Sequence, residues 1–188
     1  MPFDRLDDPT RRETLWRDMR VRVHTNISYQ QHRWRILERR ENVIKVISLV
    51  SASAAFYDLK NQAAASTHLT VGVALAVIVA TNSWSLVFQW GAKARDAAKR
   101  VAAWSQLESE IVRVGLVGFD EQTLAAWEAK AAELEKDEPA ANKYLVWLAE
   151  SEARRLYPTI ALSQVGRPNP HPVLAWLQHV PRPFLAIP

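Results

Sequence analysis

The chain of 188 residues contains no cysteine and only five glycines. The absence of cysteine excludes disulfide bonds, thiolate metal sites and cysteine nucleophiles, and it is compatible with a reducing compartment. The scarcity of glycine leaves little material for a loop that cradles phosphate groups. No phosphate-binding loop, dinucleotide-binding fingerprint or nucleophile elbow occurs in the sequence. The sequence therefore predicts that no cofactor is bound.

Side chains that could build a catalytic or metal site are also sparse. No two of the five histidines have the four-residue spacing of a zinc site on a helix. The acidic cluster of Glu133, Glu135, Asp137 and Glu138 is interpreted as a solvated helix end, because nothing fixes its geometry. The net charge of +4 comes without a nucleic-acid-binding motif. We predict a protein that is not an enzyme, holds no metal and binds no nucleic acid.

Charge is missing from one long stretch, since residues 61–92 contain no Lys, Arg, Asp or Glu. Within it, residues 69–90 are long and apolar enough for a membrane span, which needs about 20 residues. A shorter apolar run covers residues 43–59, and the polar residues 60–68 join the two runs. This layout predicts a transmembrane helical hairpin. The alternative is a buried helical pair in a soluble bundle, but a soluble helix normally keeps a charged face.

Positive charges flank this predicted hairpin on one side. Residues 1–42 carry ten arginines, and the segment after residue 90 begins with several Lys and Arg residues, whereas Lys60 is the one basic residue of the loop. The positive-inside rule predicts that both termini are cytoplasmic and that residues 60–68 form an outer loop. The basic residues beside the first span are candidates for contact with anionic lipid headgroups, with a merely solvated face as the alternative. They are Arg33, Arg35, Arg39 and Arg40.

The remaining chain is predicted to be helical and cytoplasmic. Residues 1–42 repeat apolar positions every three or four residues, so we expect one helix that continues into the first span. Residues 91–157 form a second helical region, with a break at Gly115 and Gly118. Residues 158–188 hold seven of the ten prolines and are expected to lie against helices, a neighbouring subunit or the membrane. The predicted fold is an all-α membrane protein in which long cytoplasmic helices continue a two-helix transmembrane hairpin.

Small residues within the second predicted span are candidates for helix packing. Gly72, Ala76 and Ala80 follow one another at four-residue steps, which lets two helix backbones approach closely. The first span repeats this spacing with Ser48 and Ala52, and again with Ser51 and Ala55. We expect the row in the second span to face another helix.

Polar residues within the spans are candidates for a pore or for bonds between helices. Asn82 is costly at membrane depth unless it bonds to another helix or faces water. Both roles stay open from the sequence, since two helices cannot enclose a channel without further copies. The full set of polar candidates is Asn82, Ser83, Thr81, Ser48 and Ser51.

Three stretches show a family pattern: SYQQHRWRILERRENVIKVISLV, FQWGAKARDAAKRVAAWSQLESEI and LAAWEAKAAELEKDEPAANKYL. In these stretches, within residues 20–157, the chain resembles the SLATT family. The members of this family are bacterial two-transmembrane effector domains associated with SMODS nucleotidyltransferases and SLOG sensors. The likeness rests on the order and spacing of helices, and residues 158–188 lie outside it.

The resemblance implies a pore-forming homo-oligomer that permeabilises the bacterial inner membrane in an antiphage or conflict system. Its partners would be membrane lipids and a separate sensor or nucleotide-signalling protein that triggers it. Two alternatives belong to other classes. One is a membrane anchor or adaptor that recruits a cytoplasmic partner without opening a pore, and the other is a soluble helical interaction protein.

Overall fold

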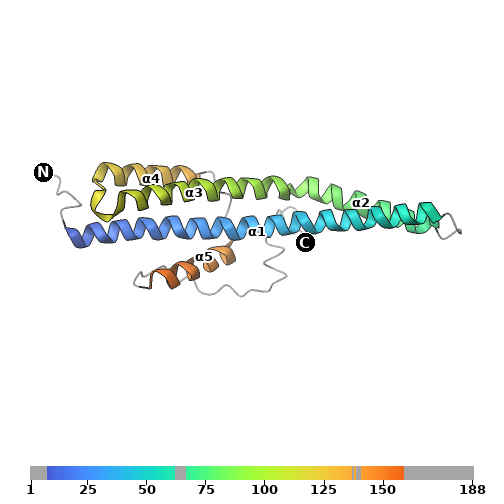
Figure 1. The fold of residues 1–188 in the computed structure, drawn as a ribbon, viewed down its shortest axis with the longest axis horizontal. Helices are drawn as coiled ribbons and strands as arrows, with labels where there is room; N and C mark the ends of the chain where they lie inside the picture. Colours follow the sequence, from blue (N-terminus) through green and yellow to red (C-terminus); the bar gives the residue numbers. More distant parts are fainter. Residues whose placement is uncertain (1–7, 62–66, 137, 139–140, 159–188) are drawn as a thin grey trace, which may run out of the picture. The chain divides into compact units, whose positions relative to one another are not determined.

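A computed structural model of the chain describes residues 8–61, 67–136, 138 and 141–158. These residues form helices joined by short turns, with no strand among them, which confirms the predicted all-α class. The predicted outer loop and the proline-rich tail fall largely outside the described residues. In chain order the helices are α1 (Pro9–Asn61), α2 (Thr67–Phe88), α3 (Trp90–Gly118), α4 (Glu121–Lys136) and α5 (Lys143–Leu156), drawn in Figure 1.

Helix α1 begins where the sequence supplies a start signal. Pro9 occupies the first helical position, and Asp8 Oδ1 accepts a hydrogen bond of 2.9 Å from the backbone N–H of Thr10. From there α1 passes from the arginine-rich segment into the apolar run without a break. The sequence has neither glycine nor proline between residues 10 and 61 that could interrupt it.

The boundary between α2 and α3 lies at Gln89, whose φ of 49° is in the left-handed region. The apolar helix α2 therefore ends at Phe88, two residues before the expected end of the second span at Trp90. The aromatic rings of Trp84, Phe88 and Trp90 bracket this turn, with successive centroids 4.7 and 5.4 Å apart.

One helical stretch of the described chain, Val71–Gly118, contains a segment long and apolar enough to cross a membrane by length and composition. The apolar part of α1 does not meet this criterion within its described residues. Lys45 and the serines at positions 48, 51 and 53 lower its hydropathy.

The chain forms two compact units. Among the described residues, the core unit comprises those within 1–33 and 97–158, and the two-helix unit comprises those within 34–96. Helices α1 and α3 contribute residues to both units.

The core unit has an apolar interior. α1 and α3 bury large side chains at three- and four-residue steps, and α4 adds an inward face of the same kind. Gly115 ends the regular part of α3 at the predicted break. Its φ of 72° is a backbone conformation that residues with a Cβ rarely adopt, which explains why a glycine stands at this position. The buried residues are Met19, Val23, Ile27, Trp104, Leu107, Ile111, Phe119, Leu124, Trp127 and Ala131.

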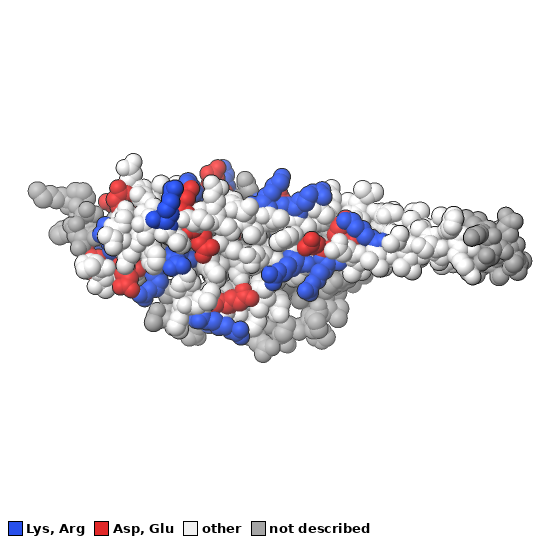
Figure 2. All heavy atoms as spheres, in the orientation of Figure 1, with Lys and Arg blue, Asp and Glu red and all other residues white. Residues whose placement is uncertain are grey.

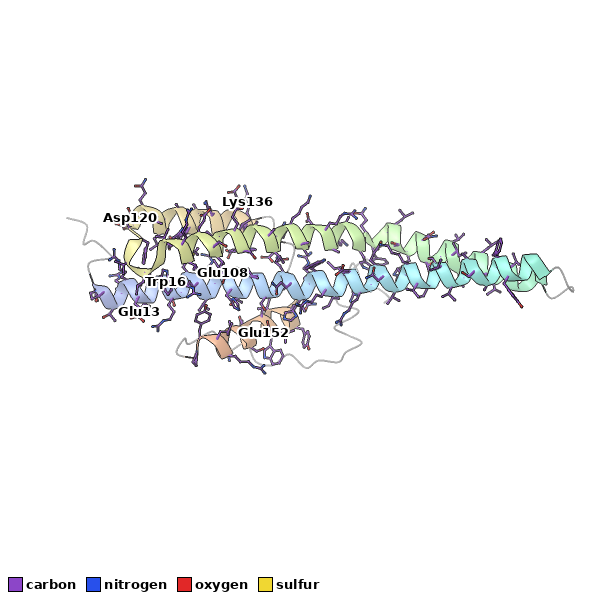
Figure 3. All side chains as sticks on the ribbon, in the orientation of Figure 1. Glu13, Trp16, Glu108, Asp120, Lys136 and Glu152 are labelled. Atoms are coloured by element: carbon purple, nitrogen blue, oxygen red, sulfur yellow. The ribbon has the colours of Figure 1, made fainter. Side chains whose placement is uncertain are left out.

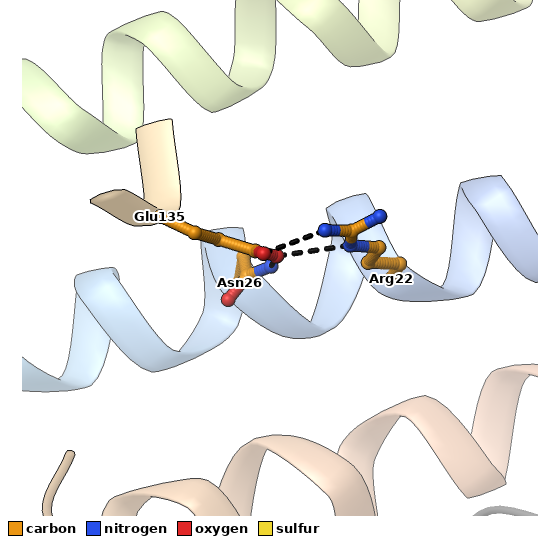
Figure 4. A network of polar contacts seen from close by, with 3 residues as sticks. All are labelled: Arg22, Asn26 and Glu135. Carbon is orange, nitrogen blue, oxygen red and sulfur yellow. Dashed lines mark hydrogen bonds and ion pairs between the residues drawn. The ribbon is translucent and has the colours of Figure 1, made fainter. Parts of the chain in front are cut away.

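Polar contacts lie around this interior rather than in it. The Arg22 guanidinium donates two hydrogen bonds of 2.9 and 2.6 Å to the carboxylate of Glu135, which joins α1 to α4 (Figure 4). The side chain of Asn26 lies 3.4 Å from the same carboxylate. A bidentate pair of this kind fixes orientation as well as distance.

Helix α5 packs on α1 through a more polar contact. Its inward face buries Leu145, Ala149 and Ala153. Glu152 lies on the side that faces α1 (Figure 3), where it accepts a hydrogen bond from Ser28 and lies 3.0 Å from His32 Nε2.

Candidate functional site: helices with a polar seam and an apolar surface

The two-helix unit pairs the second half of α1 with α2 in antiparallel order (Figure 1). On each helix the less exposed residues recur at alternating three- and four-residue steps, the spacing of a coiled-coil contact. We call these positions the seam. They are Glu41, Ile44, Ser48, Ser51 and Ala55 on α1, and Val71, Ala74, Ile78, Thr81, Ser85 and Phe88 on α2.

Six of the eleven seam side chains are small or hydroxylated, and two contacts show how the helices meet. The hydroxyls of Ser48 and Thr81 lie 3.1 Å apart. Thr81 Oγ1 is also 2.8 Å from the carbonyl oxygen of Val77 in its own helix. Such side chains allow close approach of two helices and provide hydrogen bonds between them.

A carboxylate occupies the end of the seam near the turn at Gln89. Glu41 accepts a hydrogen bond of 3.4 Å from the Ser85 hydroxyl, and its other oxygen lies 3.4 Å from Lys45 Nζ. A Cβ added at Gly91 would lie 3.2 Å from this carboxylate. The glycine therefore leaves the space that Glu41 fills.

The outward surface of the unit is largely apolar along residues 46–57 of α1 and 71–88 of α2. Of the sixteen large hydrophobic side chains exposed in the described chain, thirteen belong to this unit. Residues 46–57 and 71–88 contain no Lys, Arg, Asp or Glu, and the narrow part of the surface next to the grey atoms is white in Figure 2. The thirteen are Val43, Val46, Ile47, Leu49, Val50, Phe56, Tyr57, Val73, Leu75, Val79, Trp84, Leu86 and Val87.

The predicted polar candidates separate into two groups. Ser48, Ser51 and Thr81 lie in the seam, where the hydroxyls of Ser48 and Thr81 bond across it. Asn82 and Ser83 are exposed on the outside of α2. Thr81, the neighbour of Asn82, thus forms the bond between α1 and α2.

The predicted packing row is exposed. Gly72, Ala76 and Ala80 all lie on the outer surface of α2, and a Cβ added at Gly72 would have no neighbour within 4 Å. The contact with α1 uses a different face, on which Ala74 is the buried small residue.

The four predicted headgroup arginines have different environments. Arg35 and Arg39 are exposed, one helical turn apart. Arg40 is only 7% exposed, and its guanidinium carbon lies 5.8 Å from the centroid of the Trp90 ring. Burial lowers the pKa of Arg40. Arg33 belongs to the core unit, where its charge acts on Glu138.

Sequence reasoning missed Glu41 and Ser85 as parts of the seam, and Gly91 as the residue that makes room for Glu41. The alternating spacing of Glu41, Ile44 and Ser48 was a signal that could have identified the inner face of α1. A glycine directly after the apolar run was a second signal, because it marks a close approach.

No cluster of three or more metal-binding side chains occurs among the described residues. Comparisons with models of known protein families, with curated protein sequences and with solved structures give no match. The SLATT resemblance accordingly stays a hypothesis carried by the three sequence stretches.

Proposed function

We propose that the protein is a bacterial inner-membrane effector whose two-helix unit spans the bilayer as a hairpin and, on oligomerising, permeabilises it. The proposal rests on the distribution of side chains in this unit, which is the reverse of that in the core unit. Large apolar side chains lie outside, and small or hydroxylated side chains lie between the helices. In water, apolar surface is driven inward, as the core unit shows. In a bilayer that drive is absent between helices, so small and hydroxylated residues form the contact while large apolar residues face lipid.

Length and charge support a membrane-spanning orientation. α2 has 22 residues, which corresponds to about 33 Å of helix and matches a hydrocarbon core of about 30 Å. Exposed basic residues precede the apolar part of α1 and follow α2, so they lie at the same end of the antiparallel pair. By the positive-inside rule, this end and both termini of the chain are cytoplasmic.

The pore itself is the further step of the proposal, and Asn82 supports it. An amide on the outer surface of an apolar helix is costly in lipid unless a neighbouring molecule or water satisfies it. In a ring of hairpins, Asn82 and Ser83 would line a water-filled opening. The SLATT resemblance implies the same behaviour, with a separate sensor or nucleotide-signalling protein as trigger. We assign the protein no enzymatic activity.

Leakage from vesicles tests this function. Purified protein is reconstituted at rising protein-to-lipid ratios, and release of an entrapped dye is recorded. We expect release that rises steeply with protein density. Asn82→Leu should reduce it while reconstitution and oligomer size stay unchanged, and Val87→Leu on the same helix should have no effect.

The outcomes separate the alternatives. Protein that inserts but never releases dye, in vesicles or in cells that carry its trigger, would favour the anchor or adaptor function. Protein that stays in solution without detergent would exclude a membrane function altogether.

A further inference from the structure

A band of exposed basic side chains lies at one end of the two-helix unit, and its height along the helices can be derived from the seam. Ser48 is level with Thr81, and Glu41 lies between Ser85 and Gly91. The two helices are antiparallel, so each step back along α1 is matched by one step forward along α2. Counted in this way from Ser48 and Thr81, Arg39 lies at the same height along the helix axis as Trp90.

Four exposed cations share these levels. Continuing the register places Arg35 of α1 close to the level of Ala94 in α3, so Lys93 and Arg95 fall within or next to the interval between Arg35 and Arg39. At 1.5 Å of rise per residue, the four side chains occupy a band about 8 Å deep. The headgroup layer on one side of a bilayer is about 5–8 Å deep.

The apolar surface begins directly beyond this band on both helices. Val43 is the first exposed large apolar residue of α1, and Val87, the last of α2, lies at nearly the same level. Trp84 is exposed one turn further in, where an aromatic side chain suits the boundary between headgroups and hydrocarbon.

The acidic residues near the band do not neutralise it. Glu38 is the exposed acid within these levels, and Asp96 is exposed just outside them. Glu41 lies in the seam, next to Lys45 and Ser85. In the proposed membrane orientation, these four exposed cations lie at the depth of lipid phosphates.

We infer that this band, made by Arg35, Arg39, Lys93 and Arg95, binds the headgroups of anionic phospholipids in preference to zwitterionic ones. The inference rests on the proposed membrane insertion and adds the lipid class. Each cation held near an anionic surface raises the affinity about fivefold. Several exposed cations around two helices give a preference that depends on salt, because part of the attraction is screened.

The test measures lipid selectivity around the full-length protein. It is reconstituted into phosphatidylcholine vesicles that carry traces of spin-labelled phosphatidylglycerol or spin-labelled phosphatidylcholine. Electron paramagnetic resonance gives the motionally restricted fraction of each label. We expect phosphatidylglycerol to associate severalfold more strongly than phosphatidylcholine, and high salt to reduce this ratio.

Two variants with equal loss of charge locate the effect. Changing Arg35, Arg39, Lys93 and Arg95 to Gln should bring the ratio close to one. The control changes four exposed cations of the core unit to Gln and should keep the ratio of the wild type. The control residues are Arg11, Arg113, Lys136 and Arg155.

Three contrary results would reject different parts of this inference. Equal association of both lipids with the wild type would overturn the headgroup inference while leaving insertion intact. An equal loss in both variants would overturn the assignment to the band. The absence of any restricted component would instead reject membrane insertion, on which the proposed function depends.

Discussion

In the core unit, Leu107 is 2% exposed and packs in an interior of tryptophan, isoleucine and valine side chains. In the two-helix unit, Leu86 is 76% exposed, while serine and threonine hydroxyls meet between the helices. Both units consist of α-helices with inward positions at three- and four-residue steps. They differ in which chemistry occupies those positions.

Helical spacing therefore defines which face of a helix makes a contact, but it does not define whether that face is polar or apolar. Water on the outside favours a large apolar interior, since burial of apolar area is then favourable. Lipid on the outside removes this preference and leaves close packing and hydrogen bonds to join the helices. The two units thus differ in the way expected for one unit that faces water and one that faces lipid, as proposed.

The largest contrast is expected for the same leucine truncation in the two units. Leu107→Ala should lower the free energy of unfolding by about 2–5 kcal/mol, because it leaves a cavity in the core. Leu86→Ala should change it little, because its side chain has few protein neighbours. Chemical unfolding of the protein in detergent, followed by circular dichroism, measures both. Similar losses for the two variants would mean that Leu86 is packed.

Introduction of a charge at an exposed valine distinguishes lipid from water. Val79 is 64% exposed near the middle of α2, and Val112 is 53% exposed on α3 in the core unit. Val79→Arg should disfavour insertion by about 2.5–3.5 kcal/mol. Val112→Arg should have no such effect. The membrane-bound fraction after alkaline extraction checks this contrast, and unimpaired binding of the Val79 variant would indicate that α2 faces water.

A smaller effect is expected when serine is enlarged in the seam. Ser48→Leu should destabilise the unit by about 1–3 kcal/mol, since extra volume separates α1 from α2 and breaks the contact with Thr81. Ser53→Leu is the matched change on the exposed face and should be neutral in lipid. Melting temperatures in lipid nanodiscs compare the two. Equal destabilisation would reject the assignment of the seam.

Much of the helical fold could be predicted from local sequence. The absence of charge between residues 61 and 92 indicated the apolar helix, and apolar periodicity indicated the helices around it. The break at Gly115 could be predicted because few other residues adopt its backbone conformation. These signals depend on short stretches of chain and need no knowledge of a partner.

The inner face of α2 could not be predicted in the same way. Small residues occur on both faces, so Gly72 and Ala76 were as suitable for packing as Ala74. The register with α1 decides between the faces, and register depends on pairs such as Ser48 and Thr81. The burial of Arg40 likewise depends on the turn at Gln89, which places Trp90 beside it.

The smallest effect concerns α5, whose contact with α1 is polar although it lies in the core unit. Burial by itself would raise the pKa of Glu152, but the Ser28 hydrogen bond and the attraction of His32 and His24 outweigh it, so the pKa is lowered. A carboxylate with a lowered pKa in the folded state stabilises that state above its unfolded pKa, about 4.3. This stabilisation is lost as pH falls through the lower, folded-state value.

Glu152→Gln should therefore lower the melting temperature slightly at pH 7, by an amount that corresponds to less than about 1 kcal/mol, because the pair is partly exposed. The difference from the wild type should shrink as pH falls through the lowered pKa of Glu152 in the folded state, where the wild-type carboxyl becomes protonated. Leu107→Ala provides the contrast, since the loss of apolar packing should show no such titration. A constant difference between Glu152→Gln and wild type across this range would show that α5 is held by packing rather than by the charge of Glu152.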